Sequence, residues 1–217
     1  KTSTALGKVE VLIENRLNTS CPALAELYFT VNPLPEFTVG PDDIVCVNPI
    51  PYNTPPKRIG VESAKDIYTY TWEHTNTSGI TSVFPPNDPT SPNNEYILVG
   101  EGGTYHVTAT TTDGTKCTRT LSIEMTESII ANISLDDITV EDMQDDGNNK
   151  IIIDTTNLGI GDYEYSLDEP MGLYQPNPEF NNVRPGIHTL YIRDKNGCGI
   201  AQIDISIIGY KKFFTPN

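Results

Sequence analysis

The chain has 217 residues, with 14 Lys and Arg against 29 Asp and Glu, which gives a formal net charge of −15 at pH 7. This charge excludes a general nucleic-acid binder, which needs a basic face to meet phosphates, and no apolar run approaches the length of a membrane span. The length fits one or two domains. No secretion leader is recognised at residues 1–4, so a signal for export is expected elsewhere.

The first predicted unit is a hairpin within residues 1–33. Alternating strand patterns cover residues 9–13 and 23–31, and a turn is expected over residues 18–22. Because two strands cannot bury a core by themselves, the hairpin is interpreted as the last hairpin of a preceding, truncated β-sandwich. The Asn-Pro-Leu-Pro sequence at residues 32–35 then predicts a stiff linker, since each proline fixes its own φ and restricts the residue before it.

A complete module is predicted over residues 36–128. Its strand patterns cover residues 44–47, 67–72, 96–99, 102–110 and 119–125. Tyr68, Tyr70 and Trp72 fall on one face at period two, and a lone Trp on a central strand is typical of an immunoglobulin-like core. The Pro- and Asn-rich residues 84–94 predict an exposed loop.

A second module is predicted over residues 129–208. Its strand patterns cover residues 138–140, 150–154, 163–167, 187–192 and 201–207, with strong turns at Pro185-Gly186 and Asn196-Gly197. Both modules place an aromatic strand first, then a glycine turn into a strand, then a cysteine after a turn. They are therefore interpreted as divergent repeats, with less than about a tenth of the chain in helix.

The order of these motifs resembles a known family. Tyr70-Thr71-Trp72, the Gly103–Ala109 segment and Cys117 resemble the PKD-like immunoglobulin-like repeats of Bacteroidota adhesins. Residues 163–168, 180–186 and 193–199 resemble the repeat that commonly precedes a type B sorting signal. The resemblance implies an all-β chain of tandem immunoglobulin-like (PKD-like) β-sandwich modules in an elongated array.

Residues 209–217 resemble the opening of the type B C-terminal sorting domain of the gliding-motility-associated family. The residues that would enter this domain are Tyr210, Phe213, Phe214, Thr215, Pro216 and Asn217. The resemblance implies two partners, the type IX secretion translocon and an outer-membrane β-barrel anchor protein, and a place at the cell surface, attached to the outer membrane. Phe213 and Phe214 are interpreted as packing inside the sorting domain or against the anchor; the alternative is that they belong to a neighbouring domain with no direct role in export.

The chain has four cysteines, Cys21, Cys46, Cys117 and Cys198, and none are spaced as in a zinc site. Isolated cysteines in a β-rich secreted chain suggest disulfides. Cys46 and Cys117 lie early and late in one module, so they are expected to form a bridge worth about 4 kcal/mol in the chain-entropy model. The fates of Cys21 and Cys198 stay open, although a bridge between those two is disfavoured.

Other candidate sites are weaker. Acidic residues at 136–137, 141–142 and 145–149 supply hard ligands for calcium, but no stretch fits the EF-hand spacing and a solvated turn is the preferred interpretation, so no cofactor is expected. Asp154-Thr155-Thr156 resembles a Bacteroidota O-glycosylation site at Thr155. No nucleophile-elbow motif appears, and no catalytic residues are expected.

The sequence therefore predicts a non-catalytic C-terminal stalk of a large secreted adhesin, exported by the type IX system and used in gliding motility or surface attachment. Two alternatives remain. One is a spacer or carbohydrate-binding appendage of a secreted polysaccharide-degrading enzyme, which a solvent-exposed row of Trp and Tyr would favour. The other is a passive secretion spacer with no binding of its own.

Overall fold

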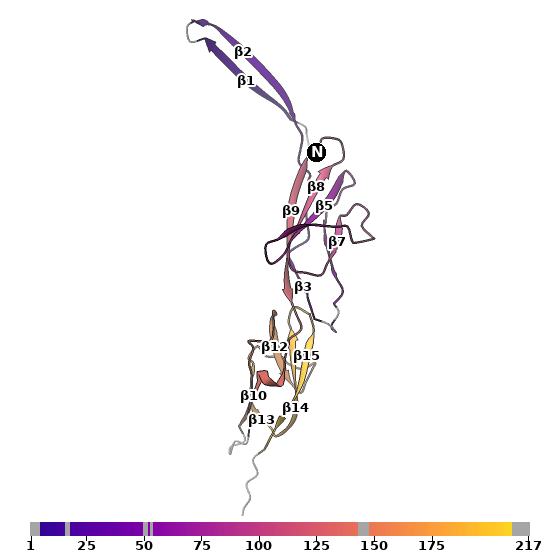
Figure 1. Ribbon diagram of the computed structural model, residues 1–217, viewed down its shortest axis with the longest axis vertical. Helices are drawn as coiled ribbons and strands as arrows, with labels where there is room; N and C mark the ends of the chain where they lie inside the picture. The colour runs from indigo at the N-terminus through magenta and orange to yellow at the C-terminus, as the bar shows by residue number, and fades with distance from the viewer. Residues whose placement is uncertain (1–4, 16–17, 50–51, 53, 143–147, 210–217) are drawn as a thin grey trace, which may run out of the picture. The chain divides into compact units, whose positions relative to one another are not determined.

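The computed structural model describes residues 5–15, 18–49, 52, 54–142 and 148–209 (Figure 1). Within these residues the chain consists of β-strands and one 3-10 helix, Leu135–Asp137. The predicted all-β class is confirmed. Contacts divide the chain into two compact units: the first contains residues 1–41, 59–97 and 105–123, and the second contains residues 42–58, 98–104 and 124–217. The predicted module boundaries at residues 33, 128 and 208 stay predictions.

Strands β1 (Ala5–Asn15) and β2 (Asn18–Val31) form an antiparallel hairpin in the first unit. Its register pairs Ala5 with Val31 and Ile13 with Ala23. The strands are longer than predicted, and residues 18–22, predicted as a turn, belong to β2. That the hairpin completes a preceding sandwich stays a prediction.

A five-stranded sheet has the order β3-β9-β8-β5-β6, and a smaller sheet pairs β4 with β7. The bounds are β3 Asp43–Cys46, β4 Lys57–Gly60, β5 Tyr68–Thr75, β6 Thr81–Phe84, β7 Tyr96–Val99, β8 Gly103–Thr111 and β9 Thr118–Ser128. Strands β3 and β9 run parallel, with Cys46 opposite Ser128, while β5 and β6 are antiparallel.

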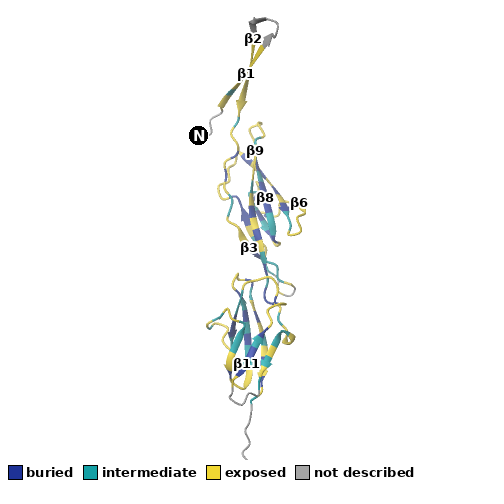
Figure 2. Ribbon diagram, turned by 90° about the vertical axis from the view of Figure 1, so that its left-hand side faces the viewer, coloured by how far each residue is buried: buried dark blue, intermediate teal, exposed yellow. Residues whose placement is uncertain are grey.

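The core of the first unit is built on alternation in β5 and β8 (Figure 2). Trp72 is 1% exposed, so the predicted core Trp is confirmed, and its indole N–H donates to the Asn94 carbonyl at 2.8 Å. His74, two residues beyond the predicted strand pattern 67–72, belongs to β5, is buried and stacks on Tyr105 with ring centroids 4.2 Å apart. Residues at period two thus bury one face of the sheet, as the sequence predicts.

The second unit contains two three-stranded antiparallel sheets, β10-β11-β13 and β12-β14-β15. The bounds are β10 Ile138–Glu141, β11 Asn149–Ile153, β12 Tyr163–Leu167, β13 Glu179–Val183, β14 Gly186–Asp194 and β15 Ile200–Ile207. Both sheets contribute to one apolar cluster, which includes Ile151, Leu190 and Ile192, all fully buried. Two sheets that share one core form a β-sandwich. With the Trp-centred core of the first unit, this is an immunoglobulin-like fold class.

Three strands were not predicted from the sequence. Strand β4 carries Lys, Arg and Gly, β6 is an edge strand with an exposed Val83, and β13 contains two consecutive Asn residues. None of these shows the run of alternating apolar residues by which a half-buried strand is recognised. Their positions are set by pairing with neighbouring strands rather than by local propensity.

Candidate functional site

The second unit contains a disulfide between Cys46, the last residue of β3, and Cys198, in the turn between β14 and β15. The two Cα atoms are 5.3 Å apart, although the cysteines are separated by 152 residues in sequence. Cys198 is buried. We call Cys46, Asn48, Asp194, Asn196 and Cys198 the bridge cluster, and it is the candidate functional site.

The predicted bridge between Cys46 and Cys117 is wrong, because Cys117 has a free thiol. The register of the parallel pair gives the reason: Cys46 lies opposite Ser128 at the end of β9, whereas Cys117 precedes the first residue of that strand. Strand β9 has 11 residues and spans about 36 Å at roughly 3.3 Å per residue. A disulfide requires Cα atoms within about 7 Å of each other.

The turn that carries Cys198 is closed by its own backbone. The Asp194 N–H donates to the Gly199 carbonyl at 3.0 Å, and the Gly197 N–H donates to the Asp194 carbonyl at 3.1 Å. Gly197 has a φ of 88°, a left-handed value that glycine adopts without steric cost. The Asn-Gly turn predicted from the sequence therefore orients the cysteine.

The Asp194 carboxylate organises this turn from inside the protein. Asp194 is 1% exposed, and its Oδ2 accepts the Cys198 N–H at 3.0 Å. Its Oδ1 accepts the Asp162 N–H at 3.2 Å and the Asn196 side-chain amide at 3.3 Å. A buried carboxylate is stable only when such donors satisfy it, so the turn and the carboxylate depend on each other.

Asn48 and Asn196 connect the turn to the segments around it. The Asn48 amide donates to the Cys198 carbonyl at 2.8 Å, and its Oδ1 accepts the Ile130 N–H at 2.7 Å. Asn196 donates to the hydroxyl of the fully buried Ser128 at 3.1 Å. Backbone groups on both sides of the bridge are therefore held by side-chain amides, which the sequence pattern alone did not single out. The signal available was Asn-Gly-Cys preceded by Asp, a composition typical of a capped turn.

Tyr163 supports the segment that follows β9. Its hydroxyl lies 3.1 Å from the Ile129 carbonyl and 3.2 Å from the carbonyls of both Leu158 and Ile160. Burial, followed by the nearby negative charge of Asp194, raises the pKa of Tyr163 to about 12. The phenol is therefore neutral at physiological pH and acts as a hydrogen-bond donor.

Strand β3 is also anchored at its N-terminal side. Lys57 forms an ion pair with Asp43 at 2.6 Å and donates to the Ile44 carbonyl at 2.9 Å. The hydrogen bond from Lys57, then that from the Ile44 N–H, lowers the pKa of the Asp43 carboxyl. Asp42 Oδ1 accepts the Glu124 N–H at 2.7 Å. Both ends of β3, at Asp42–Asp43 and at Cys46, are thus fixed to neighbouring chain.

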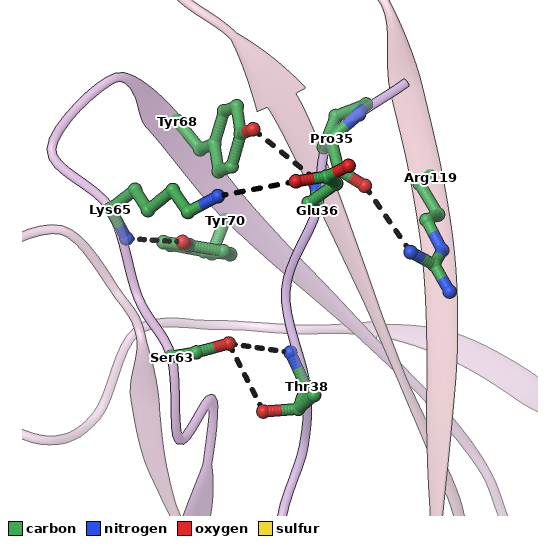
Figure 3. A network of polar contacts seen from close by, with 8 residues as sticks. All are labelled: Pro35, Glu36, Thr38, Ser63, Lys65, Tyr68, Tyr70 and Arg119. Carbon is green, nitrogen blue, oxygen red and sulfur yellow. Dashed lines mark hydrogen bonds and ion pairs between the residues drawn. The ribbon is translucent and has the colours of Figure 1, made fainter. Parts of the chain in front are cut away.

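In the first unit, the segment after the predicted linker is held by polar contacts (Figure 3). The Glu36 N–H donates to the Tyr68 hydroxyl at 3.2 Å, and the Thr38 N–H donates to the Ser63 hydroxyl at 2.8 Å. Arg119 donates to the Pro35 carbonyl at 3.5 Å. The chain therefore enters this unit along a fixed path.

The β1–β2 hairpin exposes an apolar face. Five cross-strand pairs on one side are all apolar or glycine: Ala5–Val31, Gly7–Phe29, Val9–Leu27, Val11–Ala25 and Ile13–Ala23. Val9 and Leu27 are 46% and 64% exposed. The opposite face carries Lys8, which pairs with Glu10 and Glu26. An apolar face opposite a face with charged residues is typical of a sheet that packs one side against another part of a protein.

The remaining predicted sites are only partly described. The sorting-domain residues Tyr210, Phe213, Phe214, Thr215, Pro216 and Asn217 lie outside the described residues, as do positions 143–147 of the acidic loop. Thr155 is exposed, beside an Asp154 carboxylate that accepts the Thr156 N–H at 2.9 Å. Its glycosylation and the calcium alternative stay predictions.

The histidines take part in local networks. His188 contacts Asp168 through Nδ1 and the Arg184 carbonyl through Nε2, both at 2.7 Å. His106 lies between Ser122 and Thr75, at 2.8 and 3.2 Å. Among the residues that the structure describes, no three His, Cys, Asp or Glu side chains gather as a metal site. The same residues include no helix long and apolar enough to cross a membrane.

No model of a known protein family matches the sequence, and no curated protein matches it. Among solved structures, murine CEACAM1b is similar with 10% identity and a TM-score of 0.41, covering 80% of this chain and 99% of its own. A two-domain fibronectin type III segment of chicken tenascin has 11% identity and a TM-score of 0.32, with 79% of this chain and 97% of its own covered.

Bacteroides uniformis β-glucuronidase 3 has 15% identity and a TM-score of 0.27, with 79% of this chain and 25% of that enzyme covered. These likenesses are weak in both sequence and superposition. The fold assignment therefore rests on the chain's own strands and cores.

Proposed function

We propose that this chain is a non-catalytic stalk segment of a secreted surface protein. The observation that carries the proposal is the Cys46–Cys198 bridge, which closes 152 residues of β-sandwich chain. Structural disulfides persist in oxidising environments outside the cytosol. A compact β-sandwich unit that is cross-linked by a covalent bridge suits a part that resists load.

The finer proposal is export by the type IX secretion system, through recognition of a sorting domain that begins at Tyr210, followed by attachment to an outer-membrane β-barrel protein and a role in gliding motility or adhesion. Its support is the resemblance of residues 209–217 to the opening of type B sorting domains. The strong negative charge of −15 fits an extracellular surface on which neighbouring copies repel one another.

Export is tested in intact cells. A type IX-competent Bacteroidota strain and its isogenic strain without the translocon would each make the protein that carries this chain, and protease added outside would report surface exposure. We expect digestion in the first strain only. Digestion in both strains would contradict type IX export.

The role of the sorting-domain entry is tested by Phe213→Ser combined with Phe214→Ser, which we expect to abolish export. The matched control is Met171→Ser with Leu173→Ser, two apolar residues that are 92% and 97% exposed. Normal surface display of the phenylalanine variant would remove the proposed recognition, while loss of display in the control would point to a general folding defect instead.

The alternative of a carbohydrate-binding appendage has less support. It calls for exposed aromatic side chains in a row, and the single Trp of the sequence, Trp72, is 1% exposed in the core. Stacking of a sugar on Trp72 would require the core to open.

A further inference from the structure

We propose that the Cys46–Cys198 bridge is a covalent stop that sets the maximum extension of the chain under tension. The inference deepens the proposed stalk function and rests on it. When force is applied to the chain on the N-terminal side of Cys46 and on the C-terminal side of Cys198, the disulfide transmits it directly. The chain between the two cysteines, a separation of 152 residues, then carries no tension and adds no length. The protected stretch contains every strand from β4 to β14.

The segments that the bridge does not enclose are expected to unfold one after another as the force rises. The hairpin β1–β2 has its two ends, Ala5 and Val31, paired with each other. A pull across these ends opens the ladder one pair at a time, because each hydrogen bond is loaded alone. The hairpin is therefore expected to extend first, at low force.

Strand β3 is loaded differently. It pairs with β9 in parallel over four residue pairs, from Asp43–Met125 to Cys46–Ser128. Tension enters β3 at Asp43 and leaves through the Cys46 sulfur, so it acts along the strand and loads these hydrogen bonds together in shear. The Lys57–Asp43 ion pair and the Asp42 contact to Glu124 hold the same strand at the end where the load arrives.

On the other side, the load leaves Cys198 through β15, which pairs only with β14 in its sheet. Strand β15 supplies Ala201, Ile205 and Ile207 to the core of the second unit. Loss of β15 would weaken that core. Even then the loop closed by the bridge adds no length, so the stop acts whether or not the sandwich stays folded.

The size of the effect follows from chain geometry. A fully extended chain spans at most about 3.5 Å per residue, so a separation of 152 residues corresponds to about 530 Å. The bridge replaces that length by a Cα–Cα span of 5.3 Å. Reducing the disulfide should therefore increase the fully extended length of the molecule by about 530 Å.

The test is single-molecule stretching of the 217-residue chain, held by peptide tags at Lys1 and Asn217 that are coupled to handles without cysteine chemistry. Oxidised wild-type protein is compared with the same protein after a reductant is added to the folded, tethered molecule. We expect the total contour length to rise by about 530 Å on reduction. Equal contour lengths before and after reduction would overturn the proposal that the bridge limits extension.

Serine variants identify the bridge responsible. Cys46→Ser and Cys198→Ser should show the long contour without reductant, and Cys117→Ser, the matched control, should behave as the wild type because Cys117 is unbridged. A gain on reduction of only about 250 Å, absent in Cys117→Ser, would mark a bridge from Cys46 to Cys117 and overturn the proposal. If a variant fails to fold, the reductant comparison on wild type still decides. Failure of type IX export with an intact stop would count against the proposed function alone.

Discussion

Asn48 and Asp194 show how single side chains hold the bridge in place. Each of them bonds to Cys198: Asn48 donates to its carbonyl, and Asp194 accepts its N–H. A cysteine whose backbone is fixed at both polar groups presents its sulfur in one position, which favours pairing with Cys46 over pairing with other thiols.

Removing the amide of Asn48 should destabilise the protein. In Asn48→Ala the Ile130 N–H and the Cys198 carbonyl lose their partner, and leaving part-buried polar groups unpaired costs roughly 1–3 kcal/mol. Urea unfolding of the oxidised protein would measure the loss in the free energy of unfolding. Asn157→Ala is the control, since Asn157 is exposed and makes one bond of 3.2 Å; we expect a change within about 0.5 kcal/mol. An equal loss of unfolding free energy in both variants would count against the role of Asn48 in holding the bridge cluster.

Tyr163 predicts a pH dependence at the alkaline end. Its pKa is near 10 in an unfolded chain and about 12 in the folded one, so between these values the unfolded state loses the proton first. The unfolded state then binds fewer protons than the folded state, and stability falls as pH rises from about 10 to 12. Tyr163→Phe has no proton to lose there, so its melting temperature should fall less steeply over this range than that of wild type. Parallel curves for the two proteins would contradict the role of Tyr163.

At the scale of elements, the sequence predicted local structure well where alternation is strong. Residues 96–99 and 163–167 were predicted as strands with the bounds that β7 and β12 have. Trp72 was placed correctly in the core, because aromatic residues spaced two apart along a strand all lie on the same face of the sheet, and that face is the buried one. Strands β4, β6 and β13 were missed because partner strands, rather than their own side chains, determine them.

The bridge cluster could not be predicted in the same way. Local patterns located the Asn196-Gly197 turn, but the partner of Cys198 depends on the parallel pairing of β3 with β9, which joins residues about 80 positions apart. Treating the two repeats as separate units left Cys198 without a partner and assigned Cys46 to Cys117. The contacts of Asn48 to the bridge cluster have no local sequence signature, because the Cys198 carbonyl and the Ile130 N–H lie 150 and 82 positions away, although its amide also donates to the nearby Thr54 hydroxyl.

The apolar face of the hairpin gives a prediction at this scale. Val9 and Leu27 oppose each other at the centre of five apolar pairs, so the chain by itself should bind the dye anilinonaphthalene sulfonate there. Val9→Lys with Leu27→Glu should remove most of this fluorescence. The control pair Leu12→Lys with Leu24→Glu is an equally exposed apolar pair on the opposite face, beside the charged Lys8, Glu10 and Glu26, and should remove little. If both pairs lower the signal equally, the dye does not report a single apolar face.

At the scale of the whole molecule, the packed cores and the disulfide control different properties of the chain. Close packing of the buried residues in the two units resists unfolding, while the disulfide, on our proposal, limits how far the chain extends if packing fails. The disulfide sets the maximum length and also adds to stability, because it restricts the unfolded chain, whereas packing contributes to stability alone. The proposed stalk function would require both a stable fold and a limited length, because a stalk has to keep its span under tension.

The most direct test of this account is disulfide mapping by mass spectrometry after proteolysis under non-reducing conditions, on the protein recovered from the cell surface with its thiols blocked. We expect a linked peptide pair containing Cys46 and Cys198, together with an alkylated Cys117. A linked pair containing Cys46 and Cys117, or alkylated thiols at both Cys46 and Cys198, would contradict it.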